Sequence, residues 1–206
     1  KNFRRLFSQR DYWIISLGTF CRYGIYAAVL SLWAAPFLIR IMGVSSVVCG
    51  NLLLLMSIGV VVGSPIFGWL SDSVLRNRKS VVILGLLAMS GILIQLTRLT
   101  NDSSGTVLSL LFFGFGFFSS AGGVMYAHIK ERMPIEQAGT AMTGINFFTM
   151  MGVAFFLQGM GFIMQYFHPD ASLAEGAFRD AFRFCAVSLL GAALLYGFTR
   201  ETSSRR

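Results

Sequence analysis

Residues 47–70, VVCGNLLLLMSIGVVVGSPIFGWL, contain no charged side chain. A helix needs about 20 mainly apolar residues to cross the hydrocarbon core of a bilayer. The apolar residues of this run do not alternate with polar ones, as they would in a strand with one buried face. A backbone in lipid must also satisfy its hydrogen bonds within its own segment or in a closed barrel. The run therefore predicts a membrane-spanning helix.

Five further apolar blocks flank this run. They cover about residues 12–41, 81–97, 107–129, 138–167 and 181–198. The chain of 206 residues is 55% hydrophobic and 13% charged, and this charged fraction is about half that of a soluble domain. We therefore expect an all-α membrane protein with six transmembrane helices, in which residues 1–206 form a single domain.

The basic residues predict the orientation of these helices. Most of the 17 Lys and Arg residues fall before the first block, between the second and third, between the fourth and fifth, and after the sixth. Short loops rich in Lys and Arg mark the cytoplasmic side of a membrane. Both termini are therefore expected to be cytoplasmic, in agreement with an even number of spans. The net charge of +8 follows from this asymmetry, so we expect no nucleic-acid partner.

A charged segment, GWLSDSVLRNRKS at residues 68–80, separates the second and third apolar blocks. Asp72 lies at the C-terminal end of a helix, where the helix dipole disfavours an anion by about 0.3–1 kcal/mol. A nearby arginine or the N-terminus of another helix would compensate it. Gly68, one turn earlier, permits close approach of a neighbouring backbone. The alternative is a basic membrane anchor, formed by Arg78 and Lys79, with one incidental acid.

Two stretches resemble signatures of the major facilitator superfamily of transporters. Residues 68–79 resemble its G-x-L-x-D-R-x-G-R-R/K motif, with Ser73 and Leu75 at the places of the usual base and glycine. Residues 134–141, PIEQAGTA, resemble its P-x-E-x-R-G-T-A motif, with Ala138 in place of arginine. The residues at or near matching places are Gly68, Leu70, Asp72, Arg76 and Lys79 in the first motif, and Pro134, Glu136, Gly139, Thr140 and Ala141 in the second.

The resemblance implies one half of a transporter with twelve helices, in which each six-helix half contains two inverted three-helix repeats. The weaker first signature and the segment RYGIYAAVLSLWAAPFL, residues 22–38, resemble the C-terminal half of sugar-phosphate-permease-like bacterial members. Such a protein is a multi-pass secondary transporter of the inner membrane that works by alternating access. Its partners would be a small solute, membrane lipid and the complementary six-helix half or a second copy. Between the halves, a conformational latch would form from Gly68, Asp72, Arg76, Arg78 and Lys79.

A second hypothesis is a stand-alone membrane scaffold or a half-transporter that works as a homodimer. An enzyme is not favoured, because the sequence has no Ser–His–Asp grouping and no paired carboxylates. Cys21, Cys49 and Cys185 lie inside apolar blocks without the spacing of metal ligands. We therefore predict no catalytic residue, metal or cofactor. Residues 112–123, FFGFGFFSSAGG, lack the G-x-G-x-x-G phosphate-loop pattern and predict close helix packing or a flexible helix.

Arg22 is the one residue charged at neutral pH that lies well inside an apolar block. It lies about 15 Å along the first helix from Tyr12, near the middle of the bilayer. A charge there costs at least about 2.5–3.5 kcal/mol, so the guanidinium is expected to face a polar path. The phosphate or carboxylate of an organic anion would be its natural partner. Pairing with backbone carbonyls, or with an acid outside this chain, is the alternative.

Further solute-binding candidates are polar groups in the same helix and in two others. Tyr26 and Trp33 follow Arg22 at spacings that place all three residues on one helix face. Tyr126 and Asn146 lie within the fourth and fifth apolar blocks. We predict that solute binds to Arg22, Tyr26, Tyr126 and Asn146. For the last two, hydrogen bonding between helices is the alternative.

Overall fold

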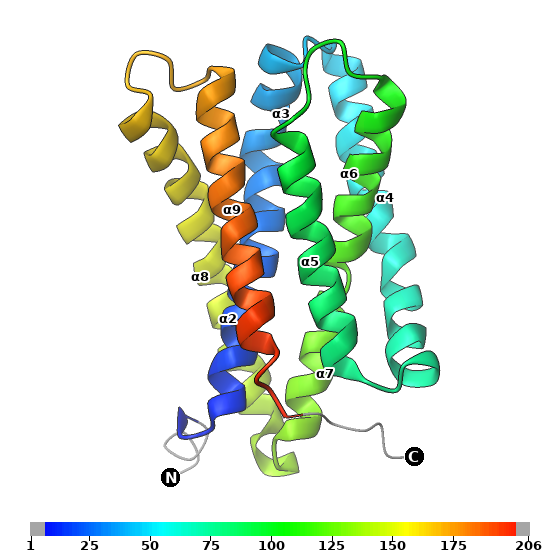
Figure 1. Cartoon of the computed structure of the whole chain (residues 1–206). Coiled ribbons are helices and arrows are strands. Elements are labelled where there is room, and N and C mark those ends of the chain that lie inside the picture. The colour runs from blue at the N-terminus through cyan, green and yellow to red at the C-terminus, as the bar shows by residue number, and fades with distance from the viewer. Residues whose placement is uncertain (1–6, 201–206) are drawn as a thin grey trace.

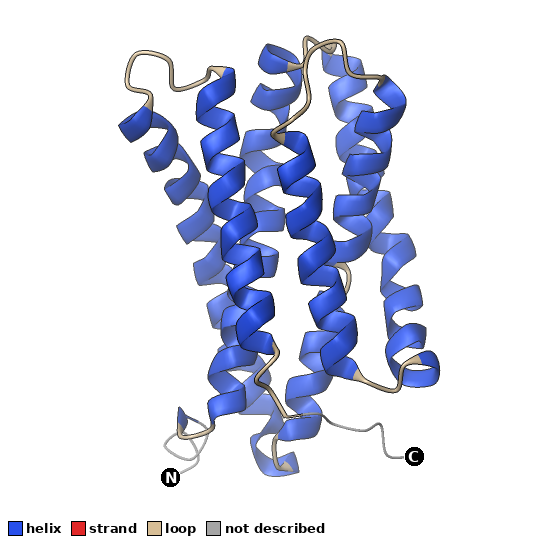
Figure 2. Ribbon diagram, in the orientation of Figure 1, coloured by secondary structure: helices blue, strands red, loops and turns tan. Residues whose placement is uncertain are grey.

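Each apolar block of the sequence becomes a helix in the computed structural model, which describes residues 7–200 without the side chains of Ile135 and Glu136. Some of the basic residues that predict the cytoplasmic side lie outside this range. They are Lys1, Arg4, Arg5, Arg205 and Arg206. No strand occurs in the described residues (Figure 2). In chain order the α-helices are α2 (Arg10–Ala28), α3 (Ala34–Pro36), α4 (Ser46–Trp69), α5 (Arg78–Leu96), α6 (Gly105–Ser119), α7 (Gly122–Arg132), α8 (Ile135–Phe167) and α9 (Glu175–Tyr196). Three π-helical turns continue them, at Val29–Trp33, Phe37–Ile41 and Leu70–Val74.

These segments form six membrane helices, because α2 continues into α3 and α6 continues into α7. Five of the six are long and apolar enough to cross a membrane. The sixth, α9, has 22 residues but carries charged residues in its first half. Two of these charges neutralise each other one turn apart, in an ion pair between Arg179 and Glu175. The chain is therefore an all-α membrane protein with six helices, as the sequence predicts.

The two ends of the described chain lie at the same end of the bundle (Figure 1). This arrangement follows from an even number of helices joined by short connections. The predicted helix boundaries agree within a few residues, except that α9 begins at Glu175 and not near residue 181. The charges of its first turns lower the local hydropathy, which explains why the sequence places this boundary too late.

Helix pairing follows a pattern that an inverted repeat would produce. The most extensive contacts join α2 to α8, α4 to α6, and α5 to α9, while α5 also packs on α6 and α2 on α9. Exchanging the first three membrane helices with the last three turns the α2–α8 pair into the α6–α4 pair. The same exchange turns α5–α6 into α9–α2 and leaves α5–α9 unchanged. These contacts therefore have the symmetry of two three-helix units of opposite topology, although α8 also packs on α9 without a comparable contact between α4 and α5.

Glycine brings the backbones together in the two symmetry-related pairs. Between α2 and α8, an added Cβ at Gly24 would collide with the backbone of Gly152. Between α4 and α6, a Cβ at Gly116 would collide with the carbonyl group of Met56. Helices in lipid gain little from the hydrophobic effect, so close backbone approach at small residues is a main source of their association.

A leucine at Gly152 should destabilise the bundle, because its Cβ would overlap the carbonyl oxygen of Phe20. We expect Gly152→Leu to lower the apparent melting temperature in detergent by roughly 4–10 °C. The matched control is Gly91→Leu on α5, where no atom lies within 4 Å of an added Cβ. Equal melting temperatures for the two variants would contradict close packing at the α2–α8 contact.

Candidate functional site

Arg22 lies in the interior of the first membrane helix. It is twelve residues into α2, about 18 Å from the first residue of that helix. Only 8% of the residue is exposed. The chain therefore holds a buried cation close to the middle of a segment that spans the membrane.

The partner of Arg22 is a helix end inside the bundle. Its Nη1 donates a hydrogen bond of 3.0 Å to the carbonyl oxygen of Ser119, the last residue of α6. In a regular helix this carbonyl would accept from the N–H of Gly123. The N–H of Gly123 instead bonds to the carbonyl of Ser120 at 3.0 Å. Arg22 thus binds a carbonyl that the interruption between α6 and α7 has released.

Gly122 provides the space for this arrangement. A Cβ at Gly122 would overlap the Cζ and Nη2 atoms of Arg22, so the guanidinium lies against the backbone at the start of α7. The Nε of Arg22 is buried and has no hydrogen-bond partner among the described residues. A cation at the C-terminal end of α6 is also favoured by the helix dipole. The guanidinium is therefore held in place but retains a donor for another acceptor.

Three tyrosines lie near the guanidinium. The Cζ of Arg22 lies 5.3 Å from the ring centroid of Tyr23, and Tyr26 and Tyr126 are close enough to interact with it electrostatically. The hydroxyl of Tyr126 shares a 3.1 Å hydrogen bond with Thr149 Oγ1 on α8. The structure therefore brings together Arg22, Tyr26 and Tyr126, three of the four predicted solute-binding residues.

Asn146, the fourth predicted residue, lies one turn before Thr149 on α8 and is exposed. Its side chain makes no hydrogen bond to any other described residue. Tyr126 has the interhelical hydrogen bond that was the alternative to solute binding, and Arg22 has the predicted alternative of a carbonyl partner. Solute binding by these residues stays a prediction.

Trp33 does not share the face of Arg22 and Tyr26. Tyr26 stacks on Phe115 of α6, with ring centroids 6.4 Å apart, whereas the Nε1 of Trp33 donates to the carbonyl of Leu157 on α8 at 3.3 Å. The helix between them is wound more widely, as a π-helical turn at Val29–Trp33. Each residue of such a turn advances less than 100° around the axis. The prediction of a common face is therefore wrong for Trp33.

Arg78 is the centre of the charged segment between the second and third membrane helices. Its guanidinium forms a two-pronged contact with Glu131 of α7, at 2.8 and 2.5 Å. It also donates to Ser71 Oγ at 3.1 Å and pairs with Asp72 at 2.7 Å. One buried arginine therefore joins the ends of three membrane helices, and Asp72, 53% exposed, has its compensating cation inside this chain.

The other predicted latch residues lie around Arg78. Lys79 Nζ donates to the carbonyl of Thr199 at 3.2 Å. Arg76 is exposed and has φ of 48°, the left-handed conformation that closes the turn. Gly68 has no atom of the described residues within 4 Å of an added Cβ, so no backbone in the described part of the chain approaches it closely.

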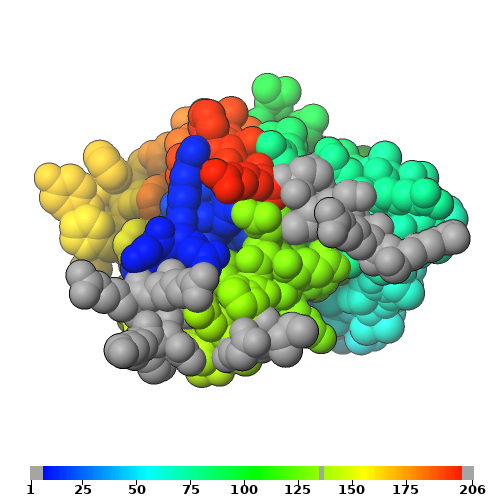
Figure 3. All heavy atoms as spheres, turned by 90° about the horizontal axis from the view of Figure 1, so that it is seen from below, coloured from blue at the N-terminus to red at the C-terminus, as the bar shows by residue number. Residues whose placement is uncertain are grey.

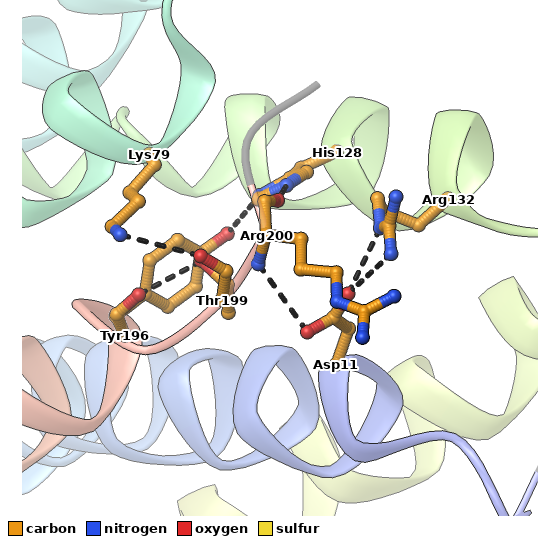
Figure 4. A network of polar contacts seen from close by, with 7 residues as sticks. All are labelled: Asp11, Lys79, His128, Arg132, Tyr196, Thr199 and Arg200. Atoms are coloured by element: carbon orange, nitrogen blue, oxygen red, sulfur yellow. Dashed lines mark hydrogen bonds and ion pairs between the residues drawn. The ribbon is translucent and has the colours of Figure 1, made fainter.

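A second polar network ties the two chain ends together (Figure 4). Asp11 at the start of α2 accepts from Arg132 Nε and Nη2 at 2.9 and 2.6 Å. The hydroxyl of Tyr196 lies 2.9 Å from His128 Nδ1, and His128 Nε2 lies 3.2 Å from the carbonyl of Arg200. A carbonyl only accepts hydrogen bonds, so in the neutral ring Nε2 carries the proton and the tyrosine donates to Nδ1.

Sequence reasoning missed the partners of the two buried arginines. Ser119 and Gly122 carry a signal in the run of small residues SSAGG, which favours an interrupted helix, but nothing in it points to Arg22. Glu131 is an acid in a basic loop, a pattern that many short loops share. Among the described residues, no group of three or more His, Cys, Asp or Glu side chains is placed to hold a metal ion.

The comparisons with known proteins agree with this architecture. The family description of the Major Facilitator Superfamily matches residues 15–206. The chain belongs to the Major Facilitator Superfamily. It is thus a multi-pass membrane protein of a transporter family. The comparison with curated proteins gives no significant match.

One solved structure shows how much of a superfamily fold the chain covers. It is the crystal structure of a bacterial homolog of the human lysosomal transporter Spinster, in an inward-facing and occupied conformation. The two chains are 17% identical with a TM-score of 0.61, and the match covers 94% of this chain and 49% of the other. The chain therefore spans about half the length of this superfamily structure.

Gly122→Ala should displace the Arg22 guanidinium from Ser119, because the new methyl group would occupy its place. Loss of a charged hydrogen bond of about 1.5–3 kcal/mol should lower the apparent melting temperature by roughly 3–8 °C. Gly123→Ala is the matched control, since no atom lies within 4 Å of a Cβ there. It should leave the melting temperature unchanged or raise it slightly, because alanine favours a helix. Equal melting temperatures for Gly122→Ala and Gly123→Ala would show that Gly122 does not position Arg22.

Proposed function

We propose that the chain is the C-terminal six-helix half of a secondary transporter of the bacterial inner membrane, similar to sugar-phosphate permeases, which moves a small organic anion by alternating access. The share of the Spinster homolog that it covers and the symmetry of its helix packing support a half-transporter. The superfamily supports solute transport. The orientation with cytoplasmic termini is supported by the basic residues at the end where both termini lie.

The single observation that supports an anionic solute is the environment of Arg22. A buried cation inside a span marks a substrate path more often than a structural support. Its Nη1 has a carbonyl partner, while its Nε has none among the described residues. A carboxylate or phosphate forms two parallel hydrogen bonds with a guanidinium and neutralises its charge, which a carbonyl does not. An anion is therefore a stronger partner for Arg22 than Ser119.

Anion binding would change the conformation of the fourth membrane helix. When a solute anion binds the guanidinium of Arg22, the carbonyl of Ser119 loses its hydrogen-bond donor at the interruption between α6 and α7. An unsatisfied carbonyl in a buried site costs about 1–3 kcal/mol, so the interruption would rearrange or admit water. Tyr26 would donate a hydroxyl hydrogen bond to the same solute, Tyr126 would do so by exchanging its bond to Thr149 for one to the solute, and Asn146 would reach it from the exposed face of α8.

Asp72, Arg78 and their neighbours serve this cycle as the latch between halves. Arg78 binds Asp72 and Glu131 within the chain, and Gly68 and Arg76 lie on the open surface beside them. The complementary half, or a second copy, would contact this surface in one conformation and leave it in the other. The latch acts on the rate of the conformational change and does not touch the solute.

Arg22→Gln in the complete protein tests the proposed site. We expect uptake of the anionic solute to fall by roughly 100-fold or more, because the solute loses a buried charged partner. Arg22→Lys keeps the charge but loses the two-pronged geometry, so its uptake should be intermediate. The measurement is uptake of labelled carboxylated and phosphorylated metabolites into proteoliposomes.

The control for that experiment is Arg98→Gln, which removes an exposed arginine after α5. It should transport normally, and all variants should elute as the wild type does from a sizing column. Undiminished uptake by a folded Arg22→Gln protein would remove Arg22 from the solute site.

Asp72→Asn tests the latch. It should lower the maximal uptake rate by several-fold while leaving the half-saturating solute concentration within about twofold of wild type, because Asp72 is remote from Arg22. Asp102→Asn, in the loop after α5, is the control for loss of one exposed acid. A weaker apparent affinity with an unchanged maximal rate would contradict the latch.

A further inference from the structure

A polar cavity lies beside the latch, at the end of the bundle that carries both termini. Its volume is about 430 Å³, and it is lined by Ser8, Gln9, Arg10, Asp11, Arg132, Phe198 and Arg200. The first turn of α2, the end of α7 and the stretch after α9 meet there. Figure 3, a view of this end, shows the start of α2 in blue against the C-terminal stretch in red.

The charges of this cavity are unbalanced, with three arginines against one aspartate. Both oxygens of Asp11 are already engaged. Oδ2 accepts from Arg132 at 2.9 and 2.6 Å, and Oδ1 accepts from the backbone N–H of Arg200 at 3.4 Å. Asp11 therefore neutralises Arg132, and both of its oxygens are already used, so it is a poor acceptor for the guanidinium groups of Arg10 and Arg200.

Arg10 and Arg200 are both exposed, and neither forms an ion pair with another described residue. The Cζ of Arg10 lies 5.5 Å from the ring centroid of Phe198, which holds its side chain at the rim of the cavity. The backbone bond between Arg200 and Asp11 holds the second arginine at the same cavity. Two exposed guanidinium groups thus line one cavity whose acid, Asp11, is already bonded to Arg132 and to the backbone of Arg200, and this favours an anion with several oxygens.

The surroundings of this cavity are those of a lipid headgroup. Phe7 and Tyr12, which flank residues 8–11 in the chain, line an apolar groove of about 610 Å³ together with Phe147, Phe148 and residues of the first turns of α8. Trp13 packs on Phe7 and Phe148 there, with ring centroids 5.6 Å from each. Aromatic side chains gather where a membrane protein crosses the polar boundary of the bilayer. A phosphate site beside a groove that fits an acyl chain matches the headgroup and the tail of a phospholipid.

We propose that Arg10 and Arg200, supported by Arg132, bind the phosphate of an anionic phospholipid, whose acyl chain lies in the groove of Phe7, Tyr12, Phe147 and Phe148. Basic pockets between membrane helices on the cytoplasmic side bind anionic headgroups in this manner. The lipid would bridge α2, α7 and the stretch after α9, which the network around Asp11 and His128 already joins. This site is separate from Arg22 and does not depend on solute transport.

Native mass spectrometry of the full chain in detergent, titrated with phosphatidylglycerol or phosphatidylcholine, tests the proposal. Phosphatidylglycerol should bind at least about tenfold more tightly than phosphatidylcholine. Each basic residue near a phosphate strengthens the binding about fivefold. The double variant Arg10→Gln/Arg200→Gln should therefore bind phosphatidylglycerol about 25-fold more weakly. Asp11 and Arg132 are left intact, so the network that holds the helix ends is kept.

The control variant is Arg40→Gln/Arg98→Gln, which removes two exposed arginines from the opposite end of the bundle and should bind as the wild type does. Equal phosphatidylglycerol binding by the two double variants would overturn the site. A second arm adds inorganic phosphate. If millimolar phosphate displaces phosphatidylglycerol completely, the site is one for free phosphate and the lipid assignment is wrong. A loss of transport in Arg22 variants would leave all these results unchanged.

Discussion

The contact between Arg22 and the carbonyl of Ser119 is the interaction on which the interior of this bundle depends. A buried guanidinium inside a span is unfavourable alone, and so is a carbonyl released by an interrupted helix. Because Arg22 Nη1 lies 3.0 Å from the carbonyl oxygen of Ser119, the guanidinium gains an acceptor and the carbonyl gains a donor. Gly122 makes the contact possible, because any side chain there would fill the space of the guanidinium. The charge and the interruption in α6–α7 are therefore one feature, contributed by two helices on opposite sides of the inverted repeat.

Two different kinds of contact hold the rest of the molecule. Within the span, glycines bring α2 against α8 and α4 against α6, so these pairs are fixed by backbone shape. At the end with both termini, the buried Arg78, the half-buried Arg132 and the buried His128 join the helix ends through directional bonds, with each arginine bound to a carboxylate. Packing of glycines is insensitive to charge, whereas the polar end responds to it.

The sequence predicts the helices well and their partners poorly. Apolar runs of the required length place every membrane helix, because lipid imposes that length on any spanning segment. The placement of α9 is the least accurate, since Glu175, Arg179 and Asp180 in its first turns hide its start. Arg22 is conspicuous as a lone charge, but its partner is a backbone carbonyl of Ser119, and carbonyls carry no sequence signal. The π-helical turn that moves Trp33 away from Arg22 has no clear sequence signal either, because its bonds depend on the packing around it.

The measurement that tests this account most directly is a structure of the complete protein with its solute bound. The account predicts that two nitrogens of Arg22 lie about 3 Å from oxygens of an anionic group, and that the carbonyl of Ser119 no longer accepts from Arg22. A bound solute that contacts other residues, while the Arg22 guanidinium still donates to Ser119, would contradict the account and leave Arg22 as a support for the interrupted helix alone.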